Sequence, residues 1–276
     1  VLRRIHAANR LWMKGEPLWE SGYNKRTKFW ATLDHDYYIG VFPVTKAQWA
    51  LVQENAGETD QAKLWPSNFR NPDYRAMRPV EKVKYNDIRN TKYPASPQSG
   101  SWLGRISSLT SVSFDLPGDA QWEYACRGDT LDGFWNDGSP MTKANAGDKF
   151  TTCPNLPGRY KGNSNSGSAT EDSDGDSGTA IVGSYRPSTW GLYDMHGNVM
   201  EFCLDYQQDN SVIAKWRGAV NANGNAALDG TGSLRFCVRG GCWQRDAYQA
   251  KSSQSNGEFA GNGYSVIGFR VVVNLK

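Results

Sequence analysis

The chain has 276 residues, of which 38% are hydrophobic and 12% aromatic, including 11 Trp and 13 Tyr. Its 31 basic and 28 acidic residues leave a formal net charge of +3, which excludes the strongly basic surface typical of nucleic-acid-binding proteins. No apolar run approaches the roughly 18 residues that a membrane span needs. The composition therefore predicts a globular chain of short elements joined by long packed loops, with no nucleic acid as partner and no membrane span.

The first hundred residues show local signals for short elements. Residues 37–45 predict a strand that ends at Pro43, and Thr45 is suited to cap a helix over residues 46–54. Residues 78–83 predict a second short strand, and Asn86 with Asp87 predicts the start of another helix. Residues 91–113 are rich in Ser, Pro and Gly, so we expect them to form an insertion.

The strongest helix signal lies in residues 114–128, where Pro117 precedes the helix, Asp119 is suited to cap it and Gly128 is suited to end it. Glu123 lies on this helix between Trp122 and Tyr124. It is either a catalytic acid or a carboxylate that holds a neighbouring loop in place. The second alternative is the commoner one for a carboxylate on a helix.

Two stretches carry oxygen ligands of the kind that a hard cation such as Ca²⁺ prefers. Residues 171–176 form an acidic loop, which is either a cation site or a solvated surface loop. Residues 190–202 place Asp194 and Glu201 on either side of a turn, and turn carbonyls between them would complete a Ca²⁺ site. His196 in this turn is a ligand, a base or a structural residue, and with only three histidines in the chain we favour the structural role.

The five cysteines form no Cys-x-x-Cys pair, which argues against a zinc site. Their odd number leaves at least one free thiol if all pairing is within the chain, so the redox compartment stays open. These residues are Cys126, Cys153, Cys203, Cys237 and Cys242.

The stretch from Arg239 to Arg270 has buried strands predicted at both ends and about twenty residues of Ser, Gly, Asn and Gln between them. Tyr248, Phe259 and Tyr264 interrupt this polar segment. Aromatic residues among small polar ones are typical of a binding loop, in which rigid contact area is combined with adaptable hydrogen bonding. The alternative is a long solvated loop whose aromatic residues fold back on the core.

Four motifs together, RPVEKVKYNDIR, FDLPGDAQWEYACRG, WGLYDMHGNVMEF and RGGCW…IGFR, resemble the formylglycine-generating enzyme, or sulfatase-modifying-factor, family. Their order and spacing agree with that family from about Tyr37 to the C-terminus. The resemblance implies an α+β fold, with residues 1–276 in a single large, loop-rich, C-type lectin-like domain of the formylglycine-generating enzyme type.

The resemblance also implies where metals bind. A structural Ca²⁺ would be held by the side chains of Asp194 and Glu201 and the carbonyls of Gly197 and Val199. A weaker second Ca²⁺ site would use Asn145, Ala146, Asp174 and Asp176. Copper is not expected, because the segment that carries the two catalytic cysteines in the enzymes, here residues 243–253, contains no cysteine. Cys237 and Cys242 have the spacing of the catalytic pair, but they lie before that segment. Because the segment itself lacks the catalytic cysteines, we expect a protein that is not an enzyme.

In place of the catalytic segment lies the aromatic and polar stretch, over about residues 242–265. This arrangement resembles the variable proteins of diversity-generating retroelements, in which adenine-directed mutagenesis of Asn codons yields a restricted set of residue types. The resemblance implies a hypervariable surface, with Trp243, Lys251 and Gln254 outside the permitted set and therefore fixed. The expected ligand-binding and variable positions are Cys242, Arg245, Asp246, Tyr248, Ser255, Gly257, Phe259, Asn262 and Tyr264.

The resemblance thus implies a receptor-like or adhesin-like protein that binds an extracellular protein or glycan at the cell surface or after secretion. The chain begins at Val1, and we expect a processed leader, in which a lipid anchor would lie. One alternative is a non-catalytic structural or assembly member of the same family. The other is a thiol oxidase that makes formylglycine.

Overall fold

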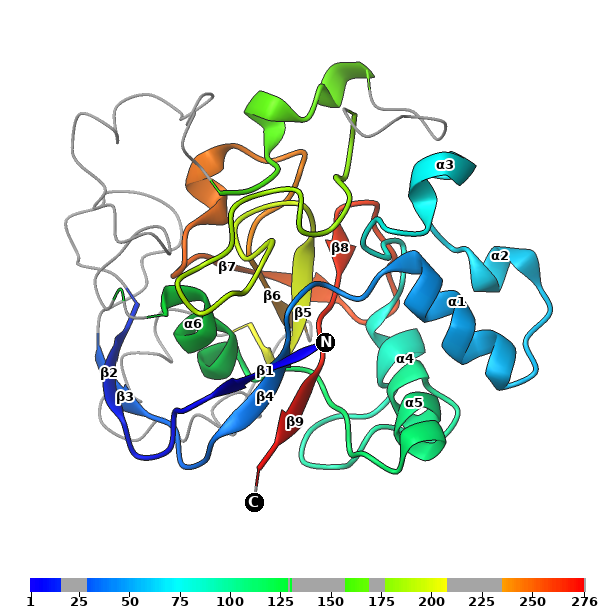
Figure 1. Cartoon of the computed structure of the whole chain (residues 1–276). Helices are drawn as coiled ribbons and strands as arrows, with labels where there is room; N and C mark the ends of the chain where they lie inside the picture. Colours follow the sequence, from blue (N-terminus) through cyan, green and yellow to red (C-terminus); the bar gives the residue numbers. More distant parts are fainter. Residues whose placement is uncertain (16–28, 129, 131–156, 169–176, 208–234, 276) are drawn as a thin grey trace.

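The computed structural model describes residues 1–15, 29–128, 130, 157–168, 177–207 and 235–275. These residues form three small sheets surrounded by short helices and long connections, in a mixed α+β arrangement (Figure 1). Two sheets lie near the ends of the chain. One has the antiparallel order β1-β4-β9, and the other pairs β2 with β3. Their strands are β1 (Leu2–Ile5), β2 (Leu11–Lys14), β3 (Phe29–Thr32), β4 (Tyr37–Gly40) and β9 (Val272–Asn274).

The third sheet has four strands in the order β7-β6-β5-β8, with β5 and β8 parallel and the other pairs antiparallel. Its strands are β5 (Met200–Tyr206), β6 (Arg235–Arg239), β7 (Ser255–Phe259) and β8 (Ile267–Gly268). The α-helices are α1 (Lys46–Asn55), α2 (Gln61–Leu64), α3 (Pro72–Arg75), α4 (Tyr85–Ile88), α5 (Trp102–Thr110) and α6 (Asp119–Arg127). Two 3-10 turns, Lys161–Asn163 and Ser166–Ser168, precede β5, and a third, Ala247–Ala250, lies between β6 and β7.

The four-stranded sheet separates the buried apolar residues into two clusters. Successive side chains of a strand point to opposite faces. On β5, Met200 and Phe202 belong to the cluster that contains Trp49, Tyr85 and Trp102 of α1, α4 and α5. On the opposite face, Cys203 belongs to the cluster that contains Ala120 and Trp122 of α6 and residues of β1 and β4. Figure 1 shows α6 and the helices α1, α4 and α5 on opposite sides of β5.

Several local predictions are confirmed. Thr45 caps α1 through a capping box, in which its side chain accepts from the Gln48 N–H and the Gln48 side chain accepts from the Thr45 N–H. Helix α6 ends at Gly128, whose φ of 57° lies in the left-handed region that favours glycine. Strand β4 and the one-turn helix α4 also form where their signals lie.

Three local predictions are wrong. Residues 78–83 form no strand beyond a single bridge between Pro79 and Thr45, because Lys82 has a φ of 61°, which extended backbone does not allow. Residues 91–113 contain α5, capped by Ser101, whose Trp102 is buried in the core. Finally, Gly118 and not Asp119 is the N-cap of α6.

Candidate ligand-binding surface and its buried anchor

The segment between β6 and β8 is an ordered excursion from the four-stranded sheet and not a free loop. Gly240 and Gly241, with φ of 92° and 68°, turn the chain after β6. The 3-10 turn at 247–250 follows, and β7 then pairs with β6 from Arg235↔Phe259 to Arg239↔Ser255. The prediction of a continuous loop here is wrong, because the edge of β6 provides backbone partners for a segment of low strand propensity.

Six of the expected variable residues reach the surface. Phe259 and Tyr264 are each 37% exposed, which is high for such large rings. Arg245 and Asn262 are also exposed, and Asp246 and Tyr248 are half-buried. We call Arg245, Asp246, Tyr248, Phe259, Asn262 and Tyr264 the display surface.

Neighbouring polar groups hold the rings of the display surface in place. The Arg235 guanidinium lies 4.7 Å from the centre of the Phe259 ring, and the Lys251 ammonium lies 4.4 Å from that of Tyr248. The Asn262 side-chain amide donates to the Tyr264 hydroxyl at 2.8 Å. These contacts reduce the rotamer freedom that a ligand would otherwise have to freeze.

Glu258 connects the two parts of the display surface, since its carboxylate interacts with Arg245 before the 3-10 turn and with Tyr264 after β7. Burial raises the pKa of Glu258 above its ordinary value, while Arg235, Arg245 and the hydrogen bond with Tyr264 act in the opposite direction. A partly buried carboxyl group therefore lies among arginines and the Tyr264 hydroxyl.

Three expected variable positions are buried, and their assignment as displayed residues is a misprediction. Cys242 is 0% exposed in the apolar cluster of α1 and α5, although its position next to Trp243 predicted an accessible thiol. Ser255 is 1% exposed at the start of β7, where it pairs with Arg239 of β6. Gly257 packs so closely on Gln207 that a Cβ atom there would lie 2.0 Å from the Gln207 Oε1.

Trp243 and Phe269 are both buried in the apolar cluster of α1 and α5, as the prediction of fixed core residues required. Trp243 packs edge-to-face on Phe69 with ring centres 5.3 Å apart, and its indole N–H donates to the Ser265 carbonyl at 2.9 Å. Phe269 packs edge-to-face on Trp102 at 5.2 Å. Lys251 and Gln254, expected to be fixed, are 2% and 3% exposed.

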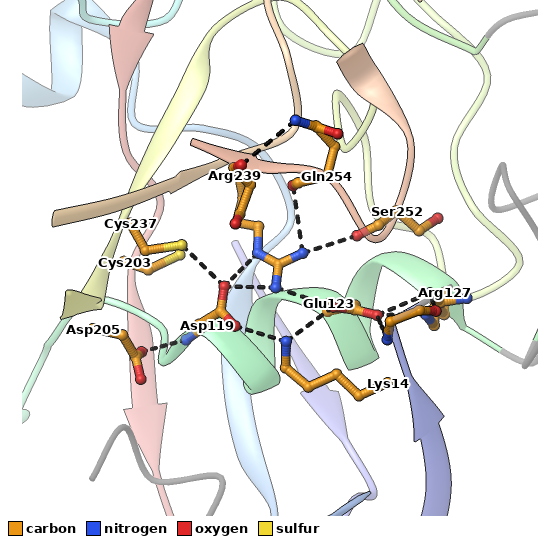
Figure 2. Close-up of polar contacts among 12 residues, drawn as sticks. Lys14, Asp119, Glu123, Arg127, Cys203, Asp205, Cys237, Arg239, Ser252 and Gln254 are labelled. Atoms are coloured by element: carbon orange, nitrogen blue, oxygen red, sulfur yellow. Dashed lines mark hydrogen bonds and ion pairs between the residues drawn. The ribbon is translucent and has the colours of Figure 1, made fainter. Parts of the chain in front are cut away.

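Arg239 joins the base of this segment to helix α6 (Figure 2). Its guanidinium lies 2.5 Å from an Asp119 oxygen and 3.0 Å from a Glu123 oxygen. The same side chain donates to the carbonyls of Ser252 at 3.2 Å and Gln254 at 3.4 Å. One buried cation thus fixes both the helix and the chain entering β7.

Glu123 is the centre of this network on the α6 side. Its fully buried carboxylate accepts from Lys14 at 3.1 Å, from Arg127 at 2.9 Å and from the Gly15 N–H at 2.8 Å. Burial opposes its ionisation, but Lys14, Arg127 and Arg239 outweigh burial and hold the pKa of Glu123 below its ordinary value. A carboxylate that stays ionised does not suit a general acid, so the geometry agrees with the loop-holding alternative.

Sequence reasoning missed most of this network. Lys14 comes from β2, Asp205 from β5 and Arg239 from β6, and Asp205 accepts from the Asp119 N–H at 2.5 Å. The Cys237 thiol also donates to Asp119 at 2.9 Å. The available signal was the pair of acids on one helix, Asp119 and Glu123, four residues apart and thus on one face.

His196 is buried and structural, in agreement with the favoured alternative. Its Nδ1 donates to the Ala250 carbonyl at 2.7 Å, at the end of the 3-10 turn. Its Nε2 lies 3.8 Å from the Cys126 thiol. The histidine thereby connects the turn at 194–198 to the 3-10 turn between β6 and β7.

Asp194 and Glu201, the expected Ca²⁺ ligands, are both buried and both bonded within the protein. Both oxygens of Glu201 accept from Arg270, at 2.6 and 2.8 Å, and Trp122 donates to one of them at 2.7 Å. Asp194 accepts from the Gly183 N–H at 2.8 Å. Burial raises the pKa of Asp194 to about 6, against the hydrogen bond from Gly183 and the charge of Arg270.

These contacts do not fit Glu201 as a Ca²⁺ ligand, because a guanidinium already occupies both oxygens and repels a second cation. They fit a hydrogen-bonded brace between the motifs at 190–202 and 267–270. Among the described residues, no group of three or more His, Cys, Asp or Glu side chains is arranged to hold a metal ion. Ca²⁺ binding through Asp194, Gly197, Val199 and Glu201 stays a prediction. The second expected site, at Asn145, Ala146, Asp174 and Asp176, lies outside the described residues, as does the whole acidic loop at 171–176.

The brace and the metal site differ in their response to a chelator. For the brace, we expect the same melting temperature in Ca²⁺ and in EDTA, and a lower melting temperature for Glu201→Gln in both. A bound ion would instead stabilise the folded state by mass action. A rise in melting temperature with Ca²⁺ that disappears in Asp194→Ala would establish the metal site.

The protein family that the sequence matches agrees with this architecture. Residues 14–275 match the model of the FGE-sulfatase family, described as the sulfatase-modifying factor enzyme 1-like domain. The chain belongs to this family. The loop-rich α+β fold of the described residues is therefore the fold of a sulfatase-modifying-factor-type domain, as the sequence motifs predicted.

Solved structures support the fold of this sulfatase-modifying-factor-type domain. The structure of PvdO from Pseudomonas aeruginosa superposes with a TM-score of 0.70 at 22% identity, covering 99% of this chain and 94% of that one. Treponema denticola variable protein 1 superposes with a TM-score of 0.66 at 20% identity, covering 99% and 95%.

Among curated proteins, the serine/threonine-protein kinase pkn1 of Chlamydia pneumoniae is 27% identical over 245 residues, or 88% of this chain. The match covers 33% of that kinase, so the domain spans about a third of the length of this relative. In the described part of the domain, no helix is long and apolar enough to cross a membrane.

Cys203 and Cys237 of this sulfatase-modifying-factor-type domain interact with each other through their side chains (Figure 2), whereas Cys242 lies apart from them. Cys237 lies in the cluster of α6 and Cys242 in that of α1 and α5, so the Cys-x₄-Cys spacing divides across the sheet. Burial raises the pKa of Cys242 to about 11 and that of Cys203 well above its ordinary value. Such thiols stay protonated at neutral pH and are poor nucleophiles. Cys153 lies outside the described residues.

Proposed function

We propose that this domain is a non-catalytic ligand-binding protein whose display surface is varied by a diversity-generating retroelement. The observation that carries the proposal is the exposure of two aromatic rings, Phe259 and Tyr264, which polar neighbours hold in place on a segment that Trp243 anchors in the core. Burying such rings contributes roughly 1.5–3 kcal/mol each, so their exposure suits a surface that a partner covers.

The placement of the fixed and permitted residue types supports variation. Trp243, Lys251 and Gln254, which mutagenesis of Asn codons cannot produce, are all buried. The six residues of the display surface are of the permitted types, whereas the exposed Gln244 and the half-buried Gln249 and Glu258 of the same segment are not and should stay constant. Substitutions at exposed positions usually change stability little, so such a surface tolerates many sequences.

The absence of catalysis is supported by the lack of the family's catalytic cysteine pair in the expected segment of this chain. No cysteine occurs in residues 243–253, and Cys237 and Cys242 are buried in separate clusters.

Treponema denticola variable protein 1, whose name denotes a variable protein, has the same fold. The ligand of the present domain would be a protein or glycan met at the cell surface or after secretion.

Sequencing many copies of this locus from related isolates tests the proposal. We expect nonsynonymous substitutions to concentrate at the display surface. They should be absent from Trp243, Lys251 and Gln254, and rare at the buried positions Cys242, Ser255 and Gly257. Substitutions spread evenly over the chain would contradict variation and favour the structural or assembly alternative. Conversion of a sulfatase-type cysteine peptide to formylglycine by the purified chain would contradict the absence of catalysis.

A further inference from the structure

Two cysteines lie opposite each other on neighbouring strands of the four-stranded sheet. Phe202 of β5 pairs with Val238 of β6, and the next residues along these antiparallel strands are Cys203 and Cys237. Both cysteines belong to the apolar cluster of α6, whereas Phe202 and Val238 belong to the cluster on the other face. The two thiols therefore point to the same side of the sheet.

The two thiol groups are in contact. Cys203 and Cys237 interact through a side-chain hydrogen bond, and Figure 2 shows their sulfur atoms next to each other beside Asp119. Residues that lie opposite each other on antiparallel strands have Cα atoms roughly 4.5–5.5 Å apart. A disulfide bond spans Cα separations of about 4.4–6.8 Å, so the backbone already has the spacing that such a bond requires.

The position of the two cysteines would give a cross-link a structural role. The register of β5 against β6 shifts between Phe202 and Tyr206, so the backbone pairing is interrupted directly after Phe202. Strand β6 leads into the segment that carries the display surface. A covalent bond between Cys203 and Cys237 would hold the two strands together at the point where their ladder is broken.

The surroundings of the cysteines tolerate the loss of both thiol hydrogens. The Cys237 thiol donates to Asp119 at 2.9 Å. The same carboxylate also pairs with the Lys14 ammonium at 2.7 Å and with the Arg239 guanidinium at 2.5 Å. Oxidation of Cys237 would therefore leave Asp119 bonded to two cations, which are stronger donors than a thiol.

The other described cysteines are held away from these two thiols. Cys242 lies in the apolar cluster on the opposite face of the sheet. The Cys126 thiol lies 3.8 Å from the Nε2 atom of His196. The fold thus favours the pairing of Cys203 with Cys237, although Cys242 is much nearer to Cys237 in the sequence.

We propose that Cys203 and Cys237 form a disulfide bond that ties β5 to β6 when the chain folds in an oxidising compartment. The two residues are 0% and 2% exposed, so the bond forms during folding, before the core closes over the thiols.

Thiol–disulfide exchange with a small disulfide such as oxidised glutathione supplies the chemistry. One cysteine thiolate displaces a glutathione thiolate from the oxidant and forms a mixed disulfide. The second cysteine thiolate then attacks the protein sulfur of that bond and releases the other glutathione. The products are one protein disulfide and two molecules of reduced glutathione, which carry the two thiol protons and the electron pair.

Refolding in a glutathione buffer tests the pairing. The reduced chain is diluted from guanidinium into reduced and oxidised glutathione, while a second sample stays in guanidinium with the same glutathione mixture. Remaining thiols are alkylated, and cross-linked peptides are identified by mass spectrometry without reduction. We expect Cys203–Cys237 to be the main pairing in the refolded chain. In the denatured chain we expect Cys237–Cys242, because short loops close at the lowest entropic cost.

The cross-link should also raise the melting temperature. It closes a loop of about 35 residues and thereby restricts the unfolded chain, so the oxidised chain should melt roughly 5–10 °C above the reduced chain. Cys203→Ala and Cys237→Ala should each remove this difference. Cys126→Ala is the matched control, since it removes a buried thiol of the same apolar cluster and should leave both the cross-link and the higher melting temperature in place.

Alkylation of both Cys203 and Cys237 in the refolded chain, under conditions that oxidise the denatured chain, would overturn the proposal. Cys237–Cys242 as the main pairing after refolding would overturn it as well, because the structure places these two residues on opposite faces of the sheet. Both results come from the unsubstituted chain, so they do not depend on the folding of any variant. They are also independent of ligand binding and of variation at the display surface.

Discussion

Replacing Arg239 with Met should lower the free energy of unfolding by about 3–5 kcal/mol, the range found when one partner of a buried ion pair is removed. Arg239 is 1% exposed and is shared by Asp119, Glu123 and the carbonyls of Ser252 and Gln254. Met keeps much of the apolar stem, so the loss reports mainly the charge and its hydrogen bonds. Urea unfolding of both proteins would measure the difference.

Two further measurements separate this anchor from a general electrostatic effect. Arg4→Met removes an arginine that pairs with Asp36 at 3.1 Å but is half-exposed, so it should change stability little. Amide hydrogen exchange over residues 251–257 should accelerate in Arg239→Met, because two carbonyls at the start of β7 lose their donor. Equal stabilities of the Arg239 and Arg4 variants would show that the network is not an anchor.

The second large effect is expected at Trp243, which is buried in the apolar cluster of α1 and α5. Trp243→Ala should cost about 3–5 kcal/mol, because it leaves a cavity against Phe69 and removes the donor to the Ser265 carbonyl. The double variant Phe259→Ser with Tyr264→Ser should retain nearly all of the unfolding free energy, since both rings are 37% exposed. Guanidinium unfolding of the three proteins compares them directly.

The ranking of these variants decides what the exposed rings do. If the double variant is destabilised as much as Trp243→Ala, then Phe259 and Tyr264 belong to the core and the display surface has no physical basis. If both rings are dispensable for folding, their exposure needs another explanation, which ligand binding supplies.

Local signals predicted the parts of the fold that local chemistry determines. The cap at Thr45, the end of α6 at Gly128 and the strand β4 each follow from one or two neighbouring residues. The family motifs predicted the architecture of the whole chain, because their order and spacing are specific.

Tertiary contacts override local signals elsewhere. Helix α5 lies in a Ser-rich and Gly-rich stretch and forms because Trp102 and Leu103 are buried against α1 and the core. Strand β7 forms in a polar segment because β6 offers an open edge. The charge network was beyond prediction, since Lys14, Asp119, Glu123, Asp205 and Arg239 are brought together only by the folded chain.

The candidate site was predictable in outline but not in detail. Six of the nine residues predicted as displayed lie at the surface, whereas the burial of Cys242, Ser255 and Gly257 depends on pairing and packing that composition does not encode. In the same way, Asp194 and Glu201 were identified as a linked pair, but their contact with Arg270 required the spatial approach of residues far apart in the chain.

The close contact between Gly257 and Gln207 constrains both the length and the sequence of the segment between β6 and β8. One residue inserted or deleted between Lys251 and Ser255 would shift the register of β7 against β6 and exchange its two faces. The side chain of Asn256 or Glu258 would then be directed at Gln207, where a single Cβ atom has no room. Under the proposed function, diversification of this surface would therefore proceed by substitution at constant length, and an engineered insertion would belong at the exposed residues Gly261 and Asn262.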